Sequence, residues 1–221
     1  MESLAAEPER EASGGIVFLR HGEGEHNVEK IYSSNPENPG YKAVKLTEHG
    51  REQVRETSDR LFESGVNGDT ICKVIVSPLP RTIETADILM GKLQVARFQR
   101  EVDPRAIEAD AGERDGQAYL KYKDPDCWFP EHPERFGWES RSKIGERMAS
   151  LIKSIVNDKN CDLSQQYVLI VSHGSPLLLA QEFLGLGDER LETAGYRIIP
   201  YAQIQKIMNS ASSKASSKSG Q

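Results

Sequence analysis

The sequence has little of what marks several large classes of protein. Only three cysteines occur in 221 residues (Cys72, Cys127 and Cys161), an odd number without the spacing of a metal-ligand motif. No apolar run is long enough to cross a bilayer, and the polar residues 1–14 do not resemble a signal peptide. We therefore expect a protein of the reducing cytoplasm that has no membrane partner.

Positive charge is also scarce. Lys and Arg number 28 against 34 Asp and Glu, which gives a formal net charge of -6 and argues against a nucleic-acid partner. The five histidines have no consistent ligand spacing, so we expect no metal; this includes the tempting pair of His21 and His26. Hydrophobic content of 37% and charged content of 28% are typical of a globular chain, and the length suits one large α/β domain.

The chain is organised around a stretch near its beginning. Residues 16–19 are apolar and indicate a buried strand, and Arg20 and His21 follow where the strand ends. Gly22 and Gly24 then make the backbone flexible. A cation and an imidazole at the end of a buried strand lie where open α/β sheets bind ligands. A strand followed by a polar turn, with His21 merely hydrogen-bonded, explains this stretch alone equally well.

Two further apolar stretches end in residues of the same kind. Residues 167–172 lead into His173 and Gly174, and residues 74–76 lead through a Ser-Pro-Leu-Pro turn to Arg81 at the start of a helix. Together with the first stretch, they bring two guanidiniums and two imidazoles to one edge of the predicted sheet. This set suits a tetrahedral phosphoryl group, because the arginine fork matches phosphate oxygens bidentately.

At these residues the chain resembles the histidine phosphatase superfamily, also called the phosphoglycerate mutase-like family. The matching motifs are Arg20-His21-Gly22-Glu23 with Asn27, Ser77-Pro78-Leu79-Pro80-Arg81, Val171-Ser172-His173-Gly174 and, more weakly, the block from Ala106 to Gly116. The resemblance implies an α/β three-layer sandwich, with a mostly parallel central sheet and helices on both faces. It implies one domain, which we place over residues 15–208. From composition we expect a mobile leader at 1–14 and a disordered, Ser- and Lys-rich tail at 209–221.

The resemblance also implies roles for the site residues. His21 is the nucleophile and carries a transient phosphohistidine, while Arg20, Arg81 and His173 hold the phosphoryl oxygens. Glu108 protonates the leaving oxygen and later activates water, although its block departs from the family pattern by having Ala-Ile at 106–107 instead of Leu-Arg. Neither a metal nor another cofactor is implied.

Three weaker binding candidates complete the predicted site. Gly22 and Gly174 would let the backbone approach the substrate. Asn27 is either an added donor to the substrate or a turn residue that bonds its own backbone.

Outside the motifs, three segments carry expectations of their own. Thr47 is the expected N-cap of a helix, and residues 198–208 are expected to supply a last edge strand. Residues 121–140 lie in a stretch rich in aromatics and prolines, which is either a rigid surface excursion or a lid whose aromatics shape substrate choice.

These observations favour a metal-independent phosphomonoesterase that acts through a phosphohistidine on a small phosphorylated metabolite or a phosphoprotein. One alternative is a phosphoglycerate mutase, but the chain lacks the Asn-Glu-Arg-His-Tyr-Gly block of the family's mutases and has a shorter interval before its second histidine. The other alternative is a non-catalytic phosphate-binding interaction module, which would be marked by the loss of His21, Arg81 or His173, and all three are present.

Overall fold

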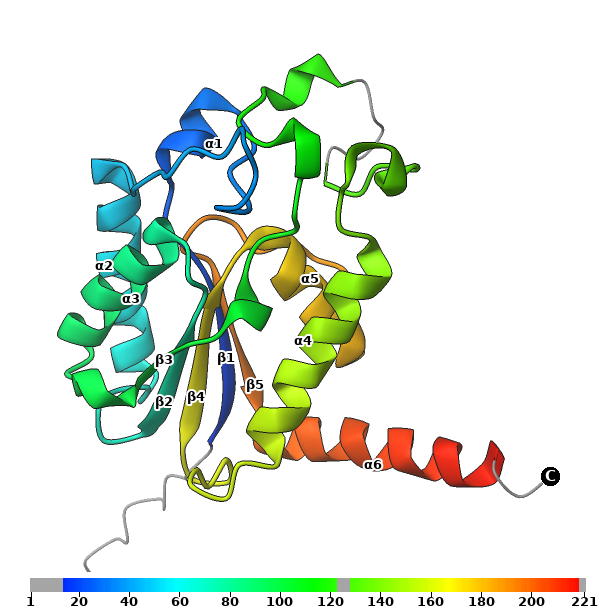
Figure 1. The fold of residues 1–221 in the computed structure, drawn as a ribbon. Helices are drawn as coiled ribbons and strands as arrows, with labels where there is room; N and C mark the ends of the chain where they lie inside the picture. The colour runs from blue at the N-terminus through cyan, green and yellow to red at the C-terminus, as the bar shows by residue number, and fades with distance from the viewer. Residues whose placement is uncertain (1–13, 123–127, 219–221) are drawn as a thin grey trace, which may run out of the picture.

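The structure, a computed structural model, describes residues 14–122 and 128–218. In these residues β1 (Gly15–Arg20), β2 (Ile71–Val76), β3 (Arg100–Val102), β4 (Tyr167–Ser172) and β5 (Tyr196–Pro200) form one sheet in the order β3-β2-β4-β1-β5 (Figure 1). The β1–β4, β2–β4 and β2–β3 pairings are parallel, and β5 pairs antiparallel with β1. The mostly parallel sheet of the predicted α/β fold is therefore confirmed.

Register brings the ends of the inner strands level. Leu19 of β1 and Val76 of β2 both pair with Val171 of β4, and Arg20 pairs with Ser172. All six residues of β4 are buried, as are the first five of β1, which explains their continuous apolar runs. Because the strands end at the same level, the residues that follow them meet at one edge of the sheet.

Helices cover both faces of the sheet (Figure 1). On one face lie α2 (Glu48–Glu63) and α3 (Pro80–Lys92), and on the other lie α4 (Arg141–Val156) and α5 (Gly174–Phe183). Alternate residues of β1 divide between the two cores, Val17 and Leu19 on the α2–α3 side and Ile16 and Phe18 on the α4–α5 side. The three-layer arrangement is confirmed, and Thr47 caps α2 as predicted, its Oγ1 accepting from the Gly50 N–H at 2.9 Å.

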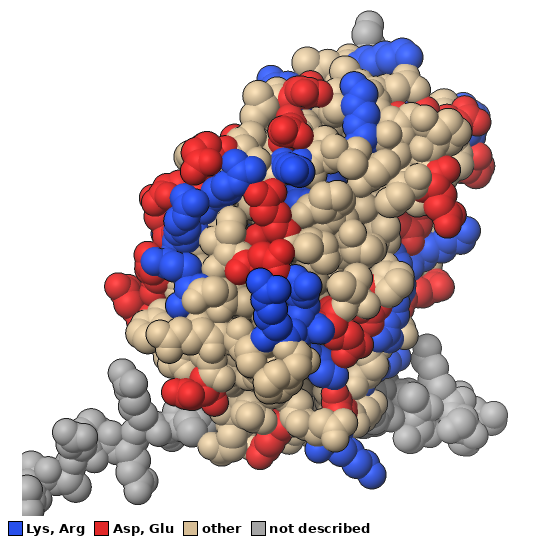
Figure 2. Space-filling view, turned by 60° about the vertical axis from the view of Figure 1, so that its left-hand side comes forward, with Lys and Arg blue, Asp and Glu red and all other residues tan. Residues whose placement is uncertain are grey.

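The surface over α2 and α3 carries both signs of charge. Figure 2, in which this side comes forward, shows Lys and Arg interspersed with Asp and Glu. Many of these charges are paired, as in the contacts of Arg51 with Glu84 at 2.7 Å and of Arg55 with Glu52 at 2.8 Å. None of the helices in the described ranges combines the length and the hydropathy needed to span a bilayer.

The C-terminal region agrees with the expectation in part. The predicted last edge strand is present as β5, but it ends at Pro200. From Tyr201 to Lys218 the chain forms α6, where the rest of that strand and then a disordered tail were expected. Ile204 is fully buried on the α4–α5 side and anchors the first turns. Once a helix has begun, each Ala, Lys or Ser that follows extends it at little cost. Residues 219–221, like 1–13 of the expected leader, lie outside the described residues.

The stretch between Tyr119 and Trp138 is built from short turns. The structure has 3₁₀ turns at Tyr119–Lys121 and Pro133–Phe136, while residues 123–127 lie outside the described part. The Tyr32 ring is packed edge-on against Trp138, with centroids 5.0 Å apart, and lies 4.7 Å from the Tyr119 ring. Tyr119 and Trp138 therefore pack on Tyr32 in the loop that follows β1, whereas Phe129 packs with Ile144 of α4 and Leu179 of α5.

Two cysteines of this structure are paired. Cys72 in β2 and Cys161, in the loop after α4, form a disulfide across 89 residues, with Cα atoms 5.8 Å apart. The odd number of cysteines in the sequence gave no indication of this pair.

Candidate active site

His21 lies directly after β1 and is 1% exposed. Its Nδ1 is 2.7 Å from the carbonyl oxygen of Gly22, which can only accept, so this contact assigns the ring proton to Nδ1. The lone pair then belongs to Nε2, which accepts from Arg81 Nε at 3.2 Å. Burial lowers the pKa of His21 well below its usual range, and Arg81 adds to the effect. His21 is therefore held neutral, with its nucleophilic nitrogen facing a guanidinium.

Arg81 lies in the first turn of α3, directly after Pro80, as predicted, and is fully buried. Its guanidinium reaches both imidazoles, because Nη2 also donates to His173 Nδ1 at 3.0 Å. Nη2 also donates to the Ser33 carbonyl at 2.9 Å, and Nη1 donates to the Ser33 Oγ at 3.3 Å. Burial lowers the pKa of Arg81 to about 10, which still leaves it charged at neutral pH.

His173 ends the β4 run and is the N-cap of α5. The ring centroids of His21 and His173 are 5.1 Å apart. Since Arg81 can only donate to Nδ1, the proton of His173 lies on Nε2, which donates to Ser77 Oγ at 2.7 Å. Burial lowers the pKa of His173 well below its usual range, with Arg81 and His21 acting in the same direction.

Arg20, the last residue of β1, brings a second guanidinium to this edge. Its Nη1 donates to the Leu191 carbonyl at 2.8 Å, which fixes the side chain. Its Nε is buried and has no hydrogen-bond partner within the described ranges. Burial lowers the pKa of Arg20, opposed first by Glu108. The two arginines and two histidines predicted from separate stretches therefore meet in one place.

Glu108 lies beside this group and is 4% exposed. One carboxylate oxygen accepts from the Ala109 N–H at 2.9 Å, and the other is 4.0 Å from His173 Nδ1. Burial raises the pKa of Glu108, while Arg81 opposes the rise. A carboxyl group with a raised pKa keeps its proton at a higher pH. Beside the guanidiniums of Arg20 and Arg81, such a group is suited to donate that proton to a substrate.

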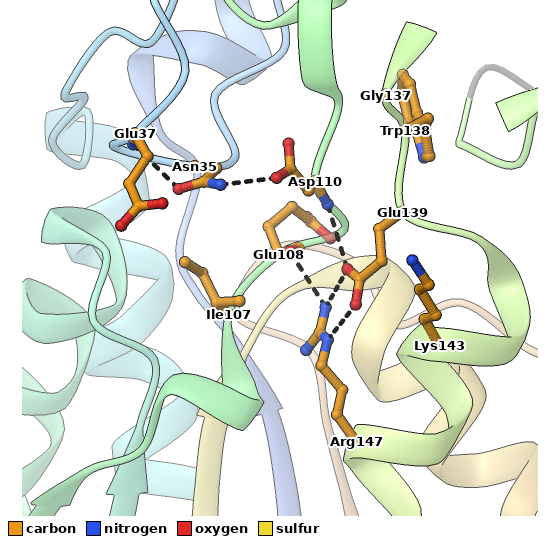
Figure 3. Close-up of a pocket in the computed structure, with 10 residues that line it drawn as sticks. All are labelled: Asn35, Glu37, Ile107, Glu108, Asp110, Gly137, Trp138, Glu139, Lys143 and Arg147. Atoms are coloured by element: carbon orange, nitrogen blue, oxygen red, sulfur yellow. Dashed lines mark hydrogen bonds and ion pairs between the residues drawn. The ribbon is translucent and has the colours of Figure 1, made fainter. Parts of the chain in front are cut away.

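A cavity of about 460 Å³ adjoins Glu108, and Figure 3 shows the side chains that line it. Arg147 of α4 forms a two-pronged ion pair with Glu139, with N–O distances of 2.8 and 2.9 Å. The same guanidinium donates to the carbonyls of Arg105 at 2.6 Å and Glu108 at 3.2 Å. Arg147 therefore clamps the backbone that carries Glu108 onto α4, an interaction that the sequence did not reveal.

The loop after β1 covers the cluster through Ser33. A buried carboxylate, Asp115, holds this loop by accepting from the N–H groups of Ser34 at 2.9 Å and Asn35 at 3.0 Å. It also accepts from the Ser34 hydroxyl at 3.1 Å and the Asn38 amide at 3.2 Å. Asp115 is 2% exposed, and it belongs to the block that resembles the family, where the sequence gave it no role of its own.

The weaker candidates have other contacts. The Asn27 side-chain oxygen accepts from the Gly24 N–H at 2.9 Å, which is the turn role considered for it. The N–H of Gly22 donates to Thr85 Oγ1 at 3.2 Å, and a Cβ at Gly22 would lie 2.4 Å from the Gly50 carbonyl, so this glycine allows α2 to approach. Gly174 lies under the Arg20 guanidinium, at the start of α5.

His26 is the functional candidate that sequence reasoning set aside. It is 2% exposed, and its ring centroid lies 5.3 Å from that of His21. Burial lowers its pKa well below the usual range, with Arg81 and Arg20 next in effect. Among the described residues, no group of three or more His, Cys, Asp or Glu side chains is placed to hold a metal ion.

Comparison with known proteins gives a family and several relatives. The family model described as the histidine phosphatase superfamily (branch 1) matches residues 16–210. A serine/threonine-protein phosphatase Pgam5, mitochondrial, from Drosophila willistoni is 30% identical over 131 residues, which are 59% of this chain and 40% of that protein. The chain thus spans less than half the length of that relative.

A second relative and a solved structure match more of their own length. A 2,3-bisphosphoglycerate-dependent phosphoglycerate mutase from Histophilus somni is 24% identical over 213 residues, covering 80% of this chain and 87% of the mutase. The solved structure of mycobacterial hydrolase 1 aligns with a TM-score of 0.64 at 21% identity, over 83% of this chain and 89% of that one. That structure shows the fold alone.

Proposed function

This chain belongs to the histidine phosphatase superfamily, and from that premise we propose that it is a metal-independent phosphomonoesterase that acts through a phosphohistidine on His21. The observation that carries the proposal is the state of the His21 ring. Its proton is held at Nδ1 by Gly22, and its Nε2 lone pair lies 3.2 Å from Arg81 Nε. A neutral imidazole beside a fixed cation is a nucleophile placed to attack phosphorus.

In the first step, Arg81 Nε transfers its hydrogen bond from Nε2 of His21 to a phosphoryl oxygen, Nε2 attacks phosphorus, and the bond from phosphorus to the ester oxygen breaks. Glu108 gives its proton to that oxygen, so the alcohol leaves neutral. Arg20 and Arg81 neutralise the charge on the phosphoryl oxygens. His173 joins them as a donor after it gains a proton on Nδ1, which the negative charge of a bound phosphoryl group favours.

In the second step, water attacks the phosphohistidine. The Glu108 carboxylate takes a proton from the water, the bond between phosphorus and Nε2 breaks, and inorganic phosphate leaves. His21 regains its lone pair, and Glu108 regains its proton. The same phosphohistidine could return phosphate to a second hydroxyl, as a mutase does, and the missing mutase block in this sequence favours water as the acceptor.

Rapid-quench labelling tests the proposal. Wild-type protein mixed with a ³²P-labelled phosphate ester in EDTA should trap a phosphoenzyme that is labile in acid and stable in base. His21→Ala should lose this label, whereas His26→Ala, which removes the neighbouring buried imidazole, should keep it. Label on serine or aspartate, or label that survives in His21→Ala, would overturn the mechanism.

A panel of phosphorylated metabolites and phosphopeptides, read by phosphate release, tests the substrate and the alternative reaction. We propose that 3-phosphoglycerate with a bisphosphoglycerate primer is isomerised more slowly than the best ester is hydrolysed. Fast isomerisation with negligible phosphate release would make the chain a mutase.

We also propose that the aromatic stretch within residues 121–140 acts as a lid. Its support is the packing of Trp128 against Tyr32 and Tyr119, with ring centroids 5.8 and 5.3 Å apart, on the loop that covers Arg81. Trp128→Ala should change the preference among substrates and leave small generic esters nearly unaffected. Equal effects on all substrates would make the stretch a scaffold only.

A further inference from the structure

One buried imidazole beside the nucleophile has no part in the proposed reaction. His26 lies in α1 (Glu25–Glu29), the short helix that follows the turn after His21, and it is 2% exposed. Its ring centroid is 5.3 Å from that of His21, and the two ring planes are tilted by 50°. His26 also acts electrostatically on both His21 and His173. By position it therefore belongs with the residues that meet at the edge of the sheet.

One edge of the His26 ring is closed off by the turn. A Cβ at Gly24 would lie 2.7 Å from His26 Nδ1 and 2.9 Å from Cε1, so the backbone of Gly24 covers this edge. Nδ1 is buried and has no hydrogen-bond partner in residues 14–122 or 128–218. Burial keeps the pKa of His26 well below its usual range, with Arg81 and Arg20 adding to the effect, so the ring is neutral. A proton on Nδ1 would be a buried donor without an acceptor, and the neutral ring therefore carries its proton on Nε2.

Most other donors of the site already have acceptors in the protein. All three guanidinium nitrogens of Arg81 donate to neighbouring residues, and the Nε2 proton of His173 is directed at Ser77. Arg20 Nη1 donates to a main-chain carbonyl. A phosphoryl group in transfer carries negative charge on its three equatorial oxygens, which fixed donors stabilise. The Nε2–H of His26 has no acceptor in the part of the chain that the structure describes, so it is a donor left for a ligand.

We propose that His26 is a further binding residue of the phosphoryl site, whose Nε2–H donates to an oxygen of the phosphoryl group that His21 attacks. The inference rests on the proposed function, because it takes the phosphoryl group to lie beside His21 Nε2. His26 adds a donor without adding a charge. Since the contact is with the phosphoryl group itself, its loss should weaken the binding of inorganic phosphate as well as that of esters.

Binding of inorganic phosphate tests the inference, measured by calorimetry in a His21→Ala background where no phosphohistidine can form. Two replacements of similar volume separate hydrogen bonding from packing. His26→Leu has no donor and should raise the dissociation constant of phosphate about ten- to a hundredfold, as expected for a hydrogen bond to a charged group. His26→Gln keeps an N–H at similar reach and should stay within about threefold of the His26 protein.

His49→Leu is the control, because it makes the same replacement at an exposed histidine of α2 and should leave phosphate binding unchanged. A ¹H–¹⁵N spectrum of the histidine rings adds a readout that a packing role would not move. The Nε2–H signal of His26 should shift when phosphate is added. Normal phosphate affinity in His26→Leu, or an equal loss in His26→Leu and His26→Gln, would overturn the inference.

Rapid-quench labelling answers a separate question. His26→Ala should still trap the phosphoenzyme because His21 is intact, but it should need a higher ester concentration to reach the same yield. Phosphate binding that depends on the His26 donor supports the inference even if no ester is hydrolysed. Failure of the proposed function would instead appear as an unlabelled His21.

Discussion

Glu108 owes its proposed role to its surroundings. Burial raises its pKa, two arginines of the site oppose the rise, and Arg147 holds its backbone in place. A carboxyl group held in this way keeps a proton at a pH where an exposed glutamate has lost it. Its contribution should depend on how strongly the leaving group needs that proton.

The leaving group therefore decides the effect of Glu108→Gln. Glutamine keeps the shape of the side chain but has no acidic proton to transfer. It should slow phosphorylation of His21 about a hundredfold or more with an alkyl phosphate, and much less with a nitrophenyl phosphate, whose phenolate leaves unaided. Burst measurements separate this step from dephosphorylation, which is common to both substrates. Asp110→Asn is the control and should not discriminate; if it does while Glu108→Gln does not, the acid is Asp110.

The opposite pKa shifts of two residues predict the pH dependence. His21 must be neutral to attack, and its lowered pKa keeps it neutral in mild acid. Glu108 must hold its proton, and its raised pKa extends the protonated form upward in pH. Single-turnover phosphorylation by an alkyl phosphate should be fastest below neutral pH, falling in stronger acid as His21 gains a proton and toward alkaline pH as Glu108 loses one. In Glu108→Gln the alkaline fall caused by Glu108 should vanish, while ionisation of the substrate affects both proteins alike. An unchanged profile would contradict the assignment.

At the scale of elements, the loop over the site is held by a carboxylate far along the chain. Asp115→Ala would leave the donors of Ser34, Asn35 and Asn38 without their acceptor. Unfolding free energy should fall by about 2–4 kcal/mol. Because Ser33 would no longer be fixed against Arg81, inorganic phosphate should inhibit the variant more weakly. Denaturant unfolding and product inhibition measure the two effects. Ala43→Ser, at an exposed position of the same loop, should change neither. An Asp115→Ala protein with normal phosphate affinity would show that the loop does not position Arg81.

The elements differ in how well sequence predicts them. β1 and β4 are visible because they are buried on both faces, so their apolar runs are continuous and the change to Arg-His or His-Gly marks their ends. α6 was missed because the sequence from Ser210 onward contains no apolar side chain larger than alanine, so it has no apolar periodicity that would indicate a helix. The loop anchor was missed because 81 residues separate Asp115 from Ser34. Local sequence patterns therefore predicted the site residues at the strand ends. The residues that hold the site in place, such as Asp115, are far from their partners in the sequence and approach them only in the folded chain.

At the scale of the whole molecule, the disulfide joins β2 to the loop after α4. A link across 89 residues restricts the unfolded chain, which stabilises a protein by about 4–5 kcal/mol in the chain-entropy account. Reduction should lower the thermal midpoint by roughly 10 °C for a chain of this size. Scanning calorimetry with and without dithiothreitol checks this, and Cys127→Ser should respond as the wild type does. A midpoint that does not move on reduction, or three titratable thiols in the unreduced protein, would contradict the pairing.

The strand order β3-β2-β4-β1-β5 has a consequence for biosynthesis. β1 leaves the ribosome before the other four strands of this sheet, yet both of its neighbours lie far along the chain, since Gly15 pairs with Tyr167 and with Pro200. At about 5–20 residues per second, the ribosome needs roughly ten to thirty seconds to reach those partners. During that interval the apolar strand that presents His21 has no native partner, and its exposed edges are open to aggregation. The nascent chain therefore exposes this strand until nearly the whole sheet has been translated.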